Sequence, residues 1–237
     1  MRAVILAGGR GTRLKPFTAT IPKPLVPLGD SAIMDVLLKR LVLCGCERAT
    51  VAVGHMAQLI MAYYGDGAKW GLSLDYCVED KPLSTIGPLT LIKDLPDDFL
   101  VMNGDLLTDL DFGALYRTHV ESGALGTVAV KAREVRIDFG VLGYDEATRR
   151  LSSFSEKPTQ SFSVSMGIYA LSKRVMDLVP SGRPFGFDDL MLACLAKGSD
   201  VRVYPYSGYW LDIGRPDDYE QATRDFPEIS ARLFGRP

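Results

Sequence analysis

No long hydrophobic run is present in this 237-residue sequence. The apolar segment at the N-terminus reaches Gly8 after only a few residues. A segment that short cannot form the core of a signal peptide, and a membrane-spanning helix needs about 20 apolar residues. We therefore expect no membrane partner and a cytoplasmic location.

An excess of basic charge is also missing. The 27 lysine and arginine residues are balanced by 29 aspartate and glutamate residues, which leaves a formal net charge of -2. The basic residues are scattered among acids, whereas proteins that bind the phosphate backbone usually carry a basic patch or stripe. The composition therefore argues against nucleic acid as a partner.

Cysteines are few, and their spacing fits no metal or redox motif. Cys44 and Cys46 are separated by one residue, while Cys77 and Cys194 stand alone. Neither a CxxC pair nor a zinc-binding pattern is present. Each cysteine has apolar neighbours, so we expect reduced thiols in the core.

Short strand-like segments alternate with helical segments through the first half of the chain. Such alternation implies right-handed crossovers and a mostly parallel sheet with helices on both faces. Apolar residues at helical spacing mark the helices, and short apolar runs mark the strands. The predicted strands are 3–6, 49–53, 72–78 and 99–102, and the predicted helices are 33–43 and 57–64.

The second half of the chain has a different pattern. Strand-like segments follow one another with polar or glycine-containing turns, which predicts a mixed or antiparallel extension that forms a wall for a substrate. Because the sequence has no linker or repeat, we expect one α/β domain over residues 1–237, with halves at about 1–122 and 123–237. The predicted elements are strands 125–131, 140–144, 151–154, 164–171 and 201–204, and helices 173–178, 187–197 and from 216 onward.

A glycine-rich turn follows the first predicted strand, where residues 8–14 read Gly-Gly-Arg-Gly-Thr-Arg-Leu. Glycines let the backbone approach a ligand and turn its N–H groups toward phosphate oxygens, and Arg13 can add a charged fork. No Gly-Lys-Ser/Thr follows as in a Walker A loop, and Leu14 stands where GxGxxG needs its third glycine. A tight turn without a ligand explains the segment equally well when it is taken alone.

Lys23 lies between Pro22 and Pro24. Proline disfavours a helix at its own position and at the preceding residue, so we predict a loop. A stiff loop would present the lysine ammonium to a phosphate, and an exposed rigid turn is the alternative.

Two aspartates follow strand-like segments. Asp105 comes after the predicted strand 99–102, and Asp212 comes after an apolar segment. Open parallel sheets bind ligands at the carboxyl ends of their strands, and carboxylate oxygens suit Mg²⁺. Helix capping is the competing explanation; Asp109 and Asp111 are better placed for it, because they lie nearer the next helix.

Five ordered motifs together resemble the sugar-1-phosphate nucleotidyltransferases. They are the glycine-rich turn, the Pro-Lys-Pro segment, a strand ending in Gly-Asp, residues 156–158 (Glu-Lys-Pro) and residues 210–214 (Trp-x-Asp-x-Gly). The likeness runs from residue 1 to about residue 222. It implies a Rossmann-like fold of the glycosyltransferase A type and Mg²⁺ as cofactor. The implied reaction transfers a nucleoside monophosphate from a triphosphate to a sugar 1-phosphate and releases pyrophosphate.

On the nucleotide side, the resemblance implies that Arg13, Lys23 and Asp105 are catalytic. Arg13 would contact the phosphates, and Lys23 would neutralise the α-phosphate and the leaving pyrophosphate. The segment 83–87 corresponds to a loop that packs against the base. The implied nucleotide-binding residues are Leu6, Ala7, Gly8, Gly9, Gly11, Thr12, Arg13, Lys23, Ser84, Thr85, Gly87, Asn103, Gly104 and Asp105.

On the sugar side, the resemblance implies that Lys157 grips the phosphate of the sugar substrate and that Glu156 lies near the sugar hydroxyls. Asp105 and Asp212 would hold the Mg²⁺ ion. The implied sugar-phosphate-binding residues are Gly140, Glu156, Lys157, Ser165, Gly167 and Asp212.

Departures from the family pattern concern specificity. Ser84 and Ile86 replace a commoner glycine and alanine beside the base, and Ser165 replaces a common asparagine beside the sugar. GTP with a mannose- or heptose-type sugar 1-phosphate is the leading hypothesis, and UTP, CTP or dTTP with another sugar 1-phosphate is the alternative. A homodimer is the common default for such enzymes.

Two other classes of protein share parts of this pattern. A non-catalytic regulatory subunit that binds nucleotide sugars would tend to lack the loop arginine, the lysine or a metal-binding acid, and all of these are present here. A glycosyltransferase would carry a DxD metal motif. Residues 109–111 match that motif superficially, but they lie beyond the strand end.

Overall fold

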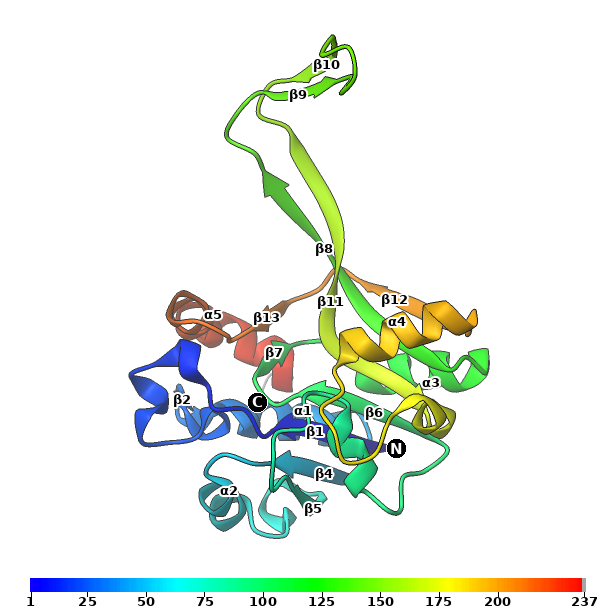
Figure 1. Ribbon diagram of the computed structural model, residues 1–237. Helices are drawn as coiled ribbons and strands as arrows, with labels where there is room; N and C mark the ends of the chain where they lie inside the picture. The colour runs from blue at the N-terminus through cyan, green and yellow to red at the C-terminus, as the bar shows by residue number, and fades with distance from the viewer. Residues whose placement is uncertain (236–237) are drawn as a thin grey trace.

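A seven-stranded sheet forms the centre of the computed structural model, which describes residues 1–235 (Figure 1). Its strand order is β12-β8-β11-β6-β1-β4-β5. Strand β11 runs antiparallel to both of its neighbours, and the other four pairs are parallel, so the predicted α/β fold with a mostly parallel sheet is confirmed. The strands are β1 Arg2–Ala7, β4 Arg48–Val53, β5 Ser73–Val78, β6 Asp98–Asn103, β8 Gly126–Arg136, β11 Thr159–Ser172 and β12 Val201–Tyr206.

Helices cover both faces of the sheet, as predicted, and α1, α2 and α4 have the predicted bounds. The predicted helical segment 173–178 is a 3₁₀ helix. Within residues 1–235, every helix is too short or too polar to cross a bilayer. The helices are α1 Ile33–Leu43, α2 Ala57–Tyr64, α3 Phe112–Ser122, α4 Phe187–Lys197 and α5 Pro216–Phe234, and the 3₁₀ helices are η1 Thr12–Leu14, η2 Phe17–Ala19, η3 Lys23–Leu25, η4 Ala68–Trp70, η5 Gly87–Leu91 and η6 Lys173–Leu178.

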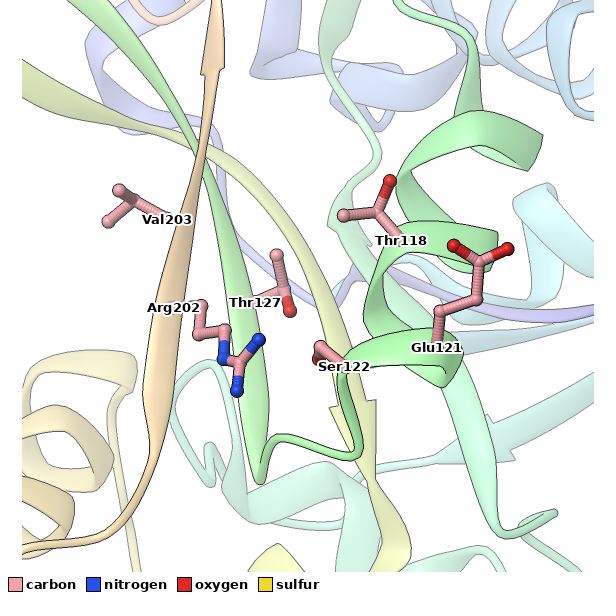
Figure 2. Close-up of a pocket in the computed structure, with 6 residues that line it drawn as sticks. All are labelled: Thr118, Glu121, Ser122, Thr127, Arg202 and Val203. Carbon is pink, nitrogen blue, oxygen red and sulfur yellow. The ribbon is translucent and has the colours of Figure 1, made fainter.

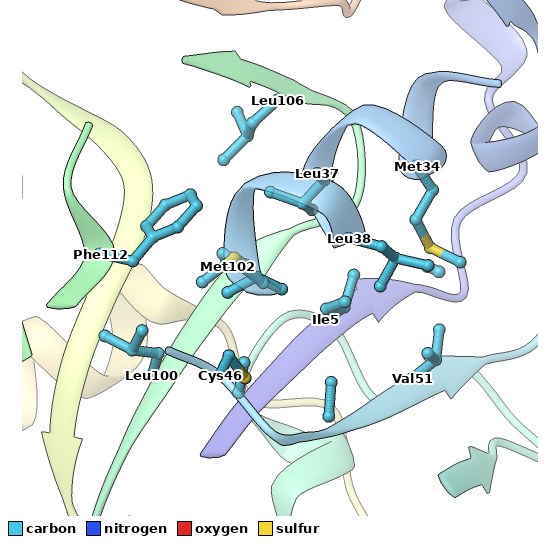
Figure 3. Packing of buried hydrophobic residues seen from close by; sticks show 14 of the residues in the cluster. Ile5, Met34, Leu37, Leu38, Cys46, Val51, Leu100, Met102, Leu106 and Phe112 are labelled. Atoms are coloured by element: carbon cyan, nitrogen blue, oxygen red, sulfur yellow. The ribbon is translucent and has the colours of Figure 1, made fainter. Parts of the chain in front are cut away.

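Strand β1 separates two apolar cores, because successive side chains of a strand point to opposite faces. Ile5 packs on one face with Leu37 of α1 and Met102 of β6 (Figure 3). Val4 packs on the other face with Leu190 of α4. Burying each such side chain contributes about 1.5–3 kcal/mol. Packing on both faces therefore holds the middle of the sheet in place, and with it the residues at the carboxyl end of β1.

Three of the four cysteines are buried free thiols, as predicted. Cys44, also predicted to be in the core, is only half-buried, because it follows the last residue of α1. Burial raises the pKa of the Cys77 thiol to about 11 and also raises that of Cys46. These thiols are therefore protonated near neutral pH, as expected of structural residues.

Strands β8 and β11 continue beyond the sheet as a two-stranded ribbon, which stays paired as far as Arg136 and Thr159. A hairpin of β9, Val141–Tyr144, and β10, Leu151–Ser155, forms its far end (Figure 1). We call residues 132–164 the arm; the structure describes all of them and none is buried. The predicted antiparallel extension exists, but its two main strands are longer than predicted and it stands away from the sheet.

Several short elements were not predicted or differ from their predictions. Residues 23–25, predicted as a loop, form the 3₁₀ helix η3. Proline is tolerated here because Pro24 lies in the first turn, where a backbone N–H would have no partner within the helix. The short strands pair as β2 Pro27–Leu28 with β3 Ser31–Ala32 and as β7 Leu106–Thr108 with β13 Trp210–Asp212.

Candidate active site

The glycine-rich turn lies at the carboxyl end of β1. Gly11 has a φ of +60°, a left-handed conformation that favours glycine, and a methyl group there would lie 2.9 Å from Thr18 Cγ2. The Thr18 hydroxyl donates to the Gly11 carbonyl oxygen at 2.7 Å and so fixes the turn. A methyl group on Gly9 would meet nothing within 4 Å. The backbone at Gly9 is therefore open to a ligand.

Asp105 and Asp212, which were predicted to share a metal ion, lie together. Asp212 is the last residue of β13, whereas the sequence placed it after a strand. Because β13 pairs with β7, Asp212 stands opposite Leu106, and Ile213 N–H donates to the Asp105 carbonyl oxygen at 3.1 Å. Burial raises the pKa of Asp212, and the nearby charge of Asp105 raises it further. The two carboxylates therefore repel one another.

Two cations stand beside this acidic pair. Lys23 Nζ donates to Asp105 Oδ2, and the lysine side chain is only 12% exposed. The Arg13 guanidinium lies 3.7 Å from the place that a methyl group on Gly214 would occupy. The charges of Lys23 and Arg13 both oppose the rise in the pKa of Asp212. The three predicted catalytic residues are thus brought together from distant parts of the chain.

The acidic pair fits a hard divalent cation. Asp105 Oδ1 is buried and has no hydrogen-bond partner among residues 1–235, which costs free energy unless an ion or water satisfies it. Asp212 is held beside it, and carboxylate oxygens are ligands that Mg²⁺ prefers. Within residues 1–235 no cluster of three Asp, Glu, His or Cys side chains forms a closed metal cage. A Mg²⁺ ion held by two carboxylates would complete its shell with water and substrate oxygens and would neutralise phosphate charge.

The other nucleotide-side residues surround this centre. Gly104 N–H donates to the Leu6 carbonyl oxygen at 2.9 Å, which joins the ends of β1 and β6. Thr12 is exposed in η1, and Asn103 is half-buried at the end of β6. Ala7 ends β1 directly before the turn.

Glu79 is a residue of this edge that the sequence analysis missed. It follows the end of β5, and its carboxylate oxygen Oε2 accepts a hydrogen bond from Leu83 N–H at 2.9 Å. A methyl group on Gly8 would lie 2.4 Å from the other oxygen, Oε1. Burial raises the pKa of Glu79. The sequence contains a related signal, because Glu79 follows the end of β5 much as Asp105 follows the end of β6.

The loop predicted to pack against the base is anchored to the start of α4. Gly87 N–H donates to the Phe185 carbonyl oxygen at 3.0 Å, and the Thr85 hydroxyl accepts from Phe187 N–H at 2.8 Å. The Thr85 hydroxyl is therefore engaged within the protein. Ser84, where the resembling family commonly has glycine, has a φ of +66°. That conformation costs a non-glycine residue about 1–2 kcal/mol, which accounts for the usual glycine.

On the sugar side, Ser165 and Gly167 lie where β11 passes the site. The ladder with β8 shifts register here, and Gly167 has a φ of +71°. A methyl group on Gly167 would lie 2.7 Å from Asn103 Nδ2, so this glycine packs directly against a nucleotide-side residue. Ser165 Oγ accepts from Gly167 N–H at 3.3 Å. Ser165, Gly167 and Asp212 therefore stand at the same edge as Asp105.

The remaining sugar-side residues lie on the arm, away from this edge. A methyl group on Gly140 would lie 3.1 Å from Glu156 Oε2, so these two residues are neighbours. Lys157 is exposed and has a φ of +45°, a strained conformation. The paired part of the arm from Ser165 to Thr159 spans roughly 20 Å at about 3.3 Å per residue, and Lys157 lies beyond its end. Within this single chain, Lys157 and Asp105 are not brought together.

The segment 109–111 is used for structural contacts. Asp111 Oδ1 accepts from Ala114 N–H at 2.9 Å and caps α3, as predicted. Asp109 caps no helix, contrary to the prediction, because its Oδ1 accepts from Tyr209 N–H at 2.7 Å. Both acids are therefore engaged, which removes the DxD metal motif that a glycosyltransferase would need.

A groove of about 300 Å³ lies between α3 and the strand edge at β12 (Figure 2). Its Arg202 side chain pairs with Asp200 at 2.9 Å. The groove contains none of the residues discussed above and lies outside the site. The residues that line it are Thr118, Glu121, Ser122, Thr127, Arg202 and Val203.

The open glycine-rich turn, the two acids and the two cations lie at one edge of the sheet, the edge at which open α/β sheets bind ligands. The model of the family described as nucleotidyl transferase matches residues 2–228. The chain belongs to this family.

Known relatives agree on the family and differ in substrate. A UTP–glucose-1-phosphate uridylyltransferase of Synechocystis sp. is 34% identical and covers 94% of this chain. A mannose-1-phosphate guanyltransferase of Yarrowia lipolytica is 32% identical and also covers 94%. The chain spans only 63% of the length of each of these relatives. Among solved structures, this chain is similar to the crystal structure of HddC from Yersinia pseudotuberculosis complexed with GMP-PN, with a TM-score of 0.69 and 27% sequence identity. The alignment covers 95% of this chain and 99% of that chain.

Proposed function

We propose that this protein transfers a nucleoside monophosphate from a nucleoside triphosphate to a sugar 1-phosphate, with release of pyrophosphate and with Mg²⁺ as cofactor. The observation that carries the proposal is the convergence of Asp105, Asp212, Lys23 and Arg13 beside an open glycine turn. The reactions in the names of both relatives support the same chemistry. We also propose that the enzyme acts in the cytoplasm and that neither a nucleic acid nor a membrane is its partner.

The residues present suffice for the chemistry. A phosphate oxygen of the sugar substrate is already ionised near neutral pH, so its attack on the α-phosphorus needs no general base. The barrier comes mainly from charge and positioning. Lys23 and Arg13 can neutralise phosphate oxygens, and a metal on Asp105 and Asp212 would add counter-charge between them. The open backbone at Gly9 allows close approach of the phosphates.

The direct test is a substrate panel. GTP, UTP, CTP and dTTP are each combined with a set of sugar 1-phosphates, and pyrophosphate release is measured. We expect release only when both substrates and Mg²⁺ are present, and none with the free sugar. Absence of release with every pair would exclude the reaction, and sugar transfer to an acceptor would identify a glycosyltransferase.

We further propose GTP as the nucleotide and a mannose- or heptose-type sugar phosphate as its partner. Glu79 supports the choice of base. Its carboxylate can accept hydrogen bonds only, and it lies at the edge where Gly8 begins the phosphate turn. Guanine presents two neighbouring N–H donors, N1–H and N2–H, whereas uracil and thymine present one donor between two acceptors. A carboxylate at Glu79 would therefore match guanine best.

Replacement of Glu79 by glutamine tests this assignment. Glutamine keeps an acceptor for Leu83 N–H but replaces the other oxygen by a donor. We expect kcat/KM for GTP to fall about 10- to 100-fold, while that for UTP or dTTP falls less. Asp80→Asn, at the exposed next residue, is the matched control and should leave the base preference unchanged. An unchanged ratio of GTP to UTP activity in Glu79→Gln would remove Glu79 from base recognition.

A further inference from the structure

Among residues 1–235, none outside the arm supports it beyond its root. Beyond Lys131, which pairs with Tyr206 of β12, the two strands of the ribbon contact only each other across the sheet. Isolated two-stranded hairpins are at best marginally stable in water. An arm of this length therefore needs a partner surface.

The tip of the arm presents an unpartnered apolar face. Leu142 stands opposite Phe154, and Tyr144 stands opposite Leu151. Leu142 and Tyr144 are two residues apart on β9, so all four side chains share one face. Each is 57–62% exposed, and nearby Phe139 is 77% exposed. Contiguous exposed apolar side chains of this kind mark an interaction site.

The arm cannot simply fold back onto the site of its own chain. Its ladder is continuous from the pair Ser165–Val130 to the pair Thr159–Arg136, without a bulge or an unpaired residue. At the root, β8 is held by its pairing with β12, and Lys131 Nζ donates to the Gly208 carbonyl oxygen. Bending the ribbon back would break these hydrogen bonds. The structure therefore holds Glu156 and Lys157 beyond the far end of a ladder that extends roughly 20 Å from Ser165 at the site edge.

We propose that two copies of this chain exchange arms, so that Lys157 of each copy completes the active site of the other. The role of Lys157 rests on the proposed function; the exchange rests on the shape and apolar face of the arm. An exposed apolar surface that could receive the tip of the arm lies beside the site. Phe17, which follows the glycine turn, is 42% exposed, and its ring centroid lies 4.7 Å from that of Tyr219. A Lys157 ammonium is also complementary in charge to the carboxylates of Asp105 and Asp212.

The area available suits a stable dimer. Five exposed apolar side chains at the tip offer roughly 100 Å² each, or about 500 Å² per arm. Two arms and the surfaces that receive them would bury about 2,000 Å² in total, at the upper end of a standard interface of about 1,200–2,000 Å². The exchange is reciprocal, as a two-fold dimer requires. A dimer without this exchange leaves each site without an arm lysine.

Mixed dimers give the decisive experiment. A chain with Asp105→Asn and a chain with Lys157→Ala are co-expressed with different tags, and the doubly tagged species is isolated. With limiting sugar 1-phosphate, we expect the Lys157→Ala homodimer to lose about 30-fold in rate, as for a lost charge-assisted contact, and the Asp105→Asn homodimer to be nearly inactive. In the mixed dimer, one site combines an intact Asp105 with an intact arm. It should therefore show about half of the wild-type rate.

The alternative outcome is equally clear. If each arm serves its own chain, every site of the mixed dimer contains one substitution, and its rate should be a few per cent of wild type. That result would overturn the exchange. Full activity of the Lys157→Ala homodimer would instead remove the proposed role of Lys157, and absence of activity in the wild type would remove the proposed function.

Sedimentation tests the exchange independently of activity. We expect the wild-type protein to sediment at twice the 26.0 kDa of one chain. The variant Leu142→Ser/Tyr144→Ser/Phe154→Ser should sediment as a monomer, since these exposed side chains do not support the fold of the body. The matched control, Leu192→Ser/Leu195→Ser on α4, removes apolar side chains that are also exposed and should remain a dimer. A monomeric wild type, or a dimeric tip variant, would overturn the proposal.

Discussion

Replacing Asp105 with asparagine is expected to lower the rate of nucleotidyl transfer by about 100-fold or more. The substitution removes one of the two carboxylate charges that face the proposed Mg²⁺ ion. It also replaces one of the two carboxylate oxygens by an NH₂ group. Of these oxygens, Oδ1 is buried with no hydrogen-bond partner in the described part of the chain, and Oδ2 accepts from Lys23. Chelation of divalent metal should abolish turnover of the wild type, and added Mg²⁺ should restore it. Pyrophosphate release at saturating substrates measures both effects.

A matched control separates this effect from a general loss of structure. Asp111→Asn makes the same chemical change six residues along, at a helix cap where asparagine serves as well as aspartate. Its rate should equal that of the wild type. Thermal unfolding of both variants reports whether the fold is retained. Full activity in excess chelator, or wild-type turnover in Asp105→Asn, would contradict a role for Asp105 in holding a metal.

The elements of the body could be predicted well because their signals are local. Helix α1 shows apolar residues at helical spacing, and its bounds were predicted at Ile33 and Leu43. Strand β1 is a short apolar run that ends at glycine. Both elements enter the core, so tertiary packing reinforces the local preference. The alternation of strands and helices then restricted the topology to a mostly parallel sheet.

The contacts of the site could be predicted only in part. The sequence shows that Asp105 follows a strand, which places it at the ligand-binding edge. It does not show that β13 pairs with β7 and so brings Asp212 beside it. The ion pair of Lys23 with Asp105 joins residues 82 positions apart, and no local pattern encodes such a contact. The position of Glu79 after a strand is visible in the sequence, but its closeness to Gly8 is a long-range contact that the sequence does not show.

The orientation of the arm could not be predicted for a related reason. Alternating apolar residues indicate strands with two different faces, but they do not say which surface covers the apolar face. The sequence therefore predicted a wall beside the substrate. In the structure, Val135 and Phe162 on the ribbon and Phe154 at its tip remain exposed. What an extended segment covers is decided by long-range contacts, including those with another molecule.

Lys23→Ala is expected to lower kcat by about 100-fold, with little change in the KM for the triphosphate. The lysine side chain is mostly buried beside Asp105, so its charge acts in a site with little water. Negative charge redistributes over the phosphate oxygens as the α-phosphorus is attacked. A fixed cation there stabilises the transition state more than bound substrate. Lys23→Arg keeps the charge with a different shape and should recover only part of the rate.

Arg13→Ala is the informative companion, because Arg13 is exposed and does not pair with Asp105. If the loss in Lys23→Ala arose only from leaving Asp105 without its counter-ion, Arg13→Ala would retain the wild-type kcat. We expect instead that both variants lose kcat. Lys93→Ala, at an exposed lysine outside the site, should behave as wild type. The measurement is steady-state kinetics with the triphosphate varied at saturating sugar 1-phosphate. If both variants change only the KM for the triphosphate, the two cations bind the nucleotide without stabilising the transition state.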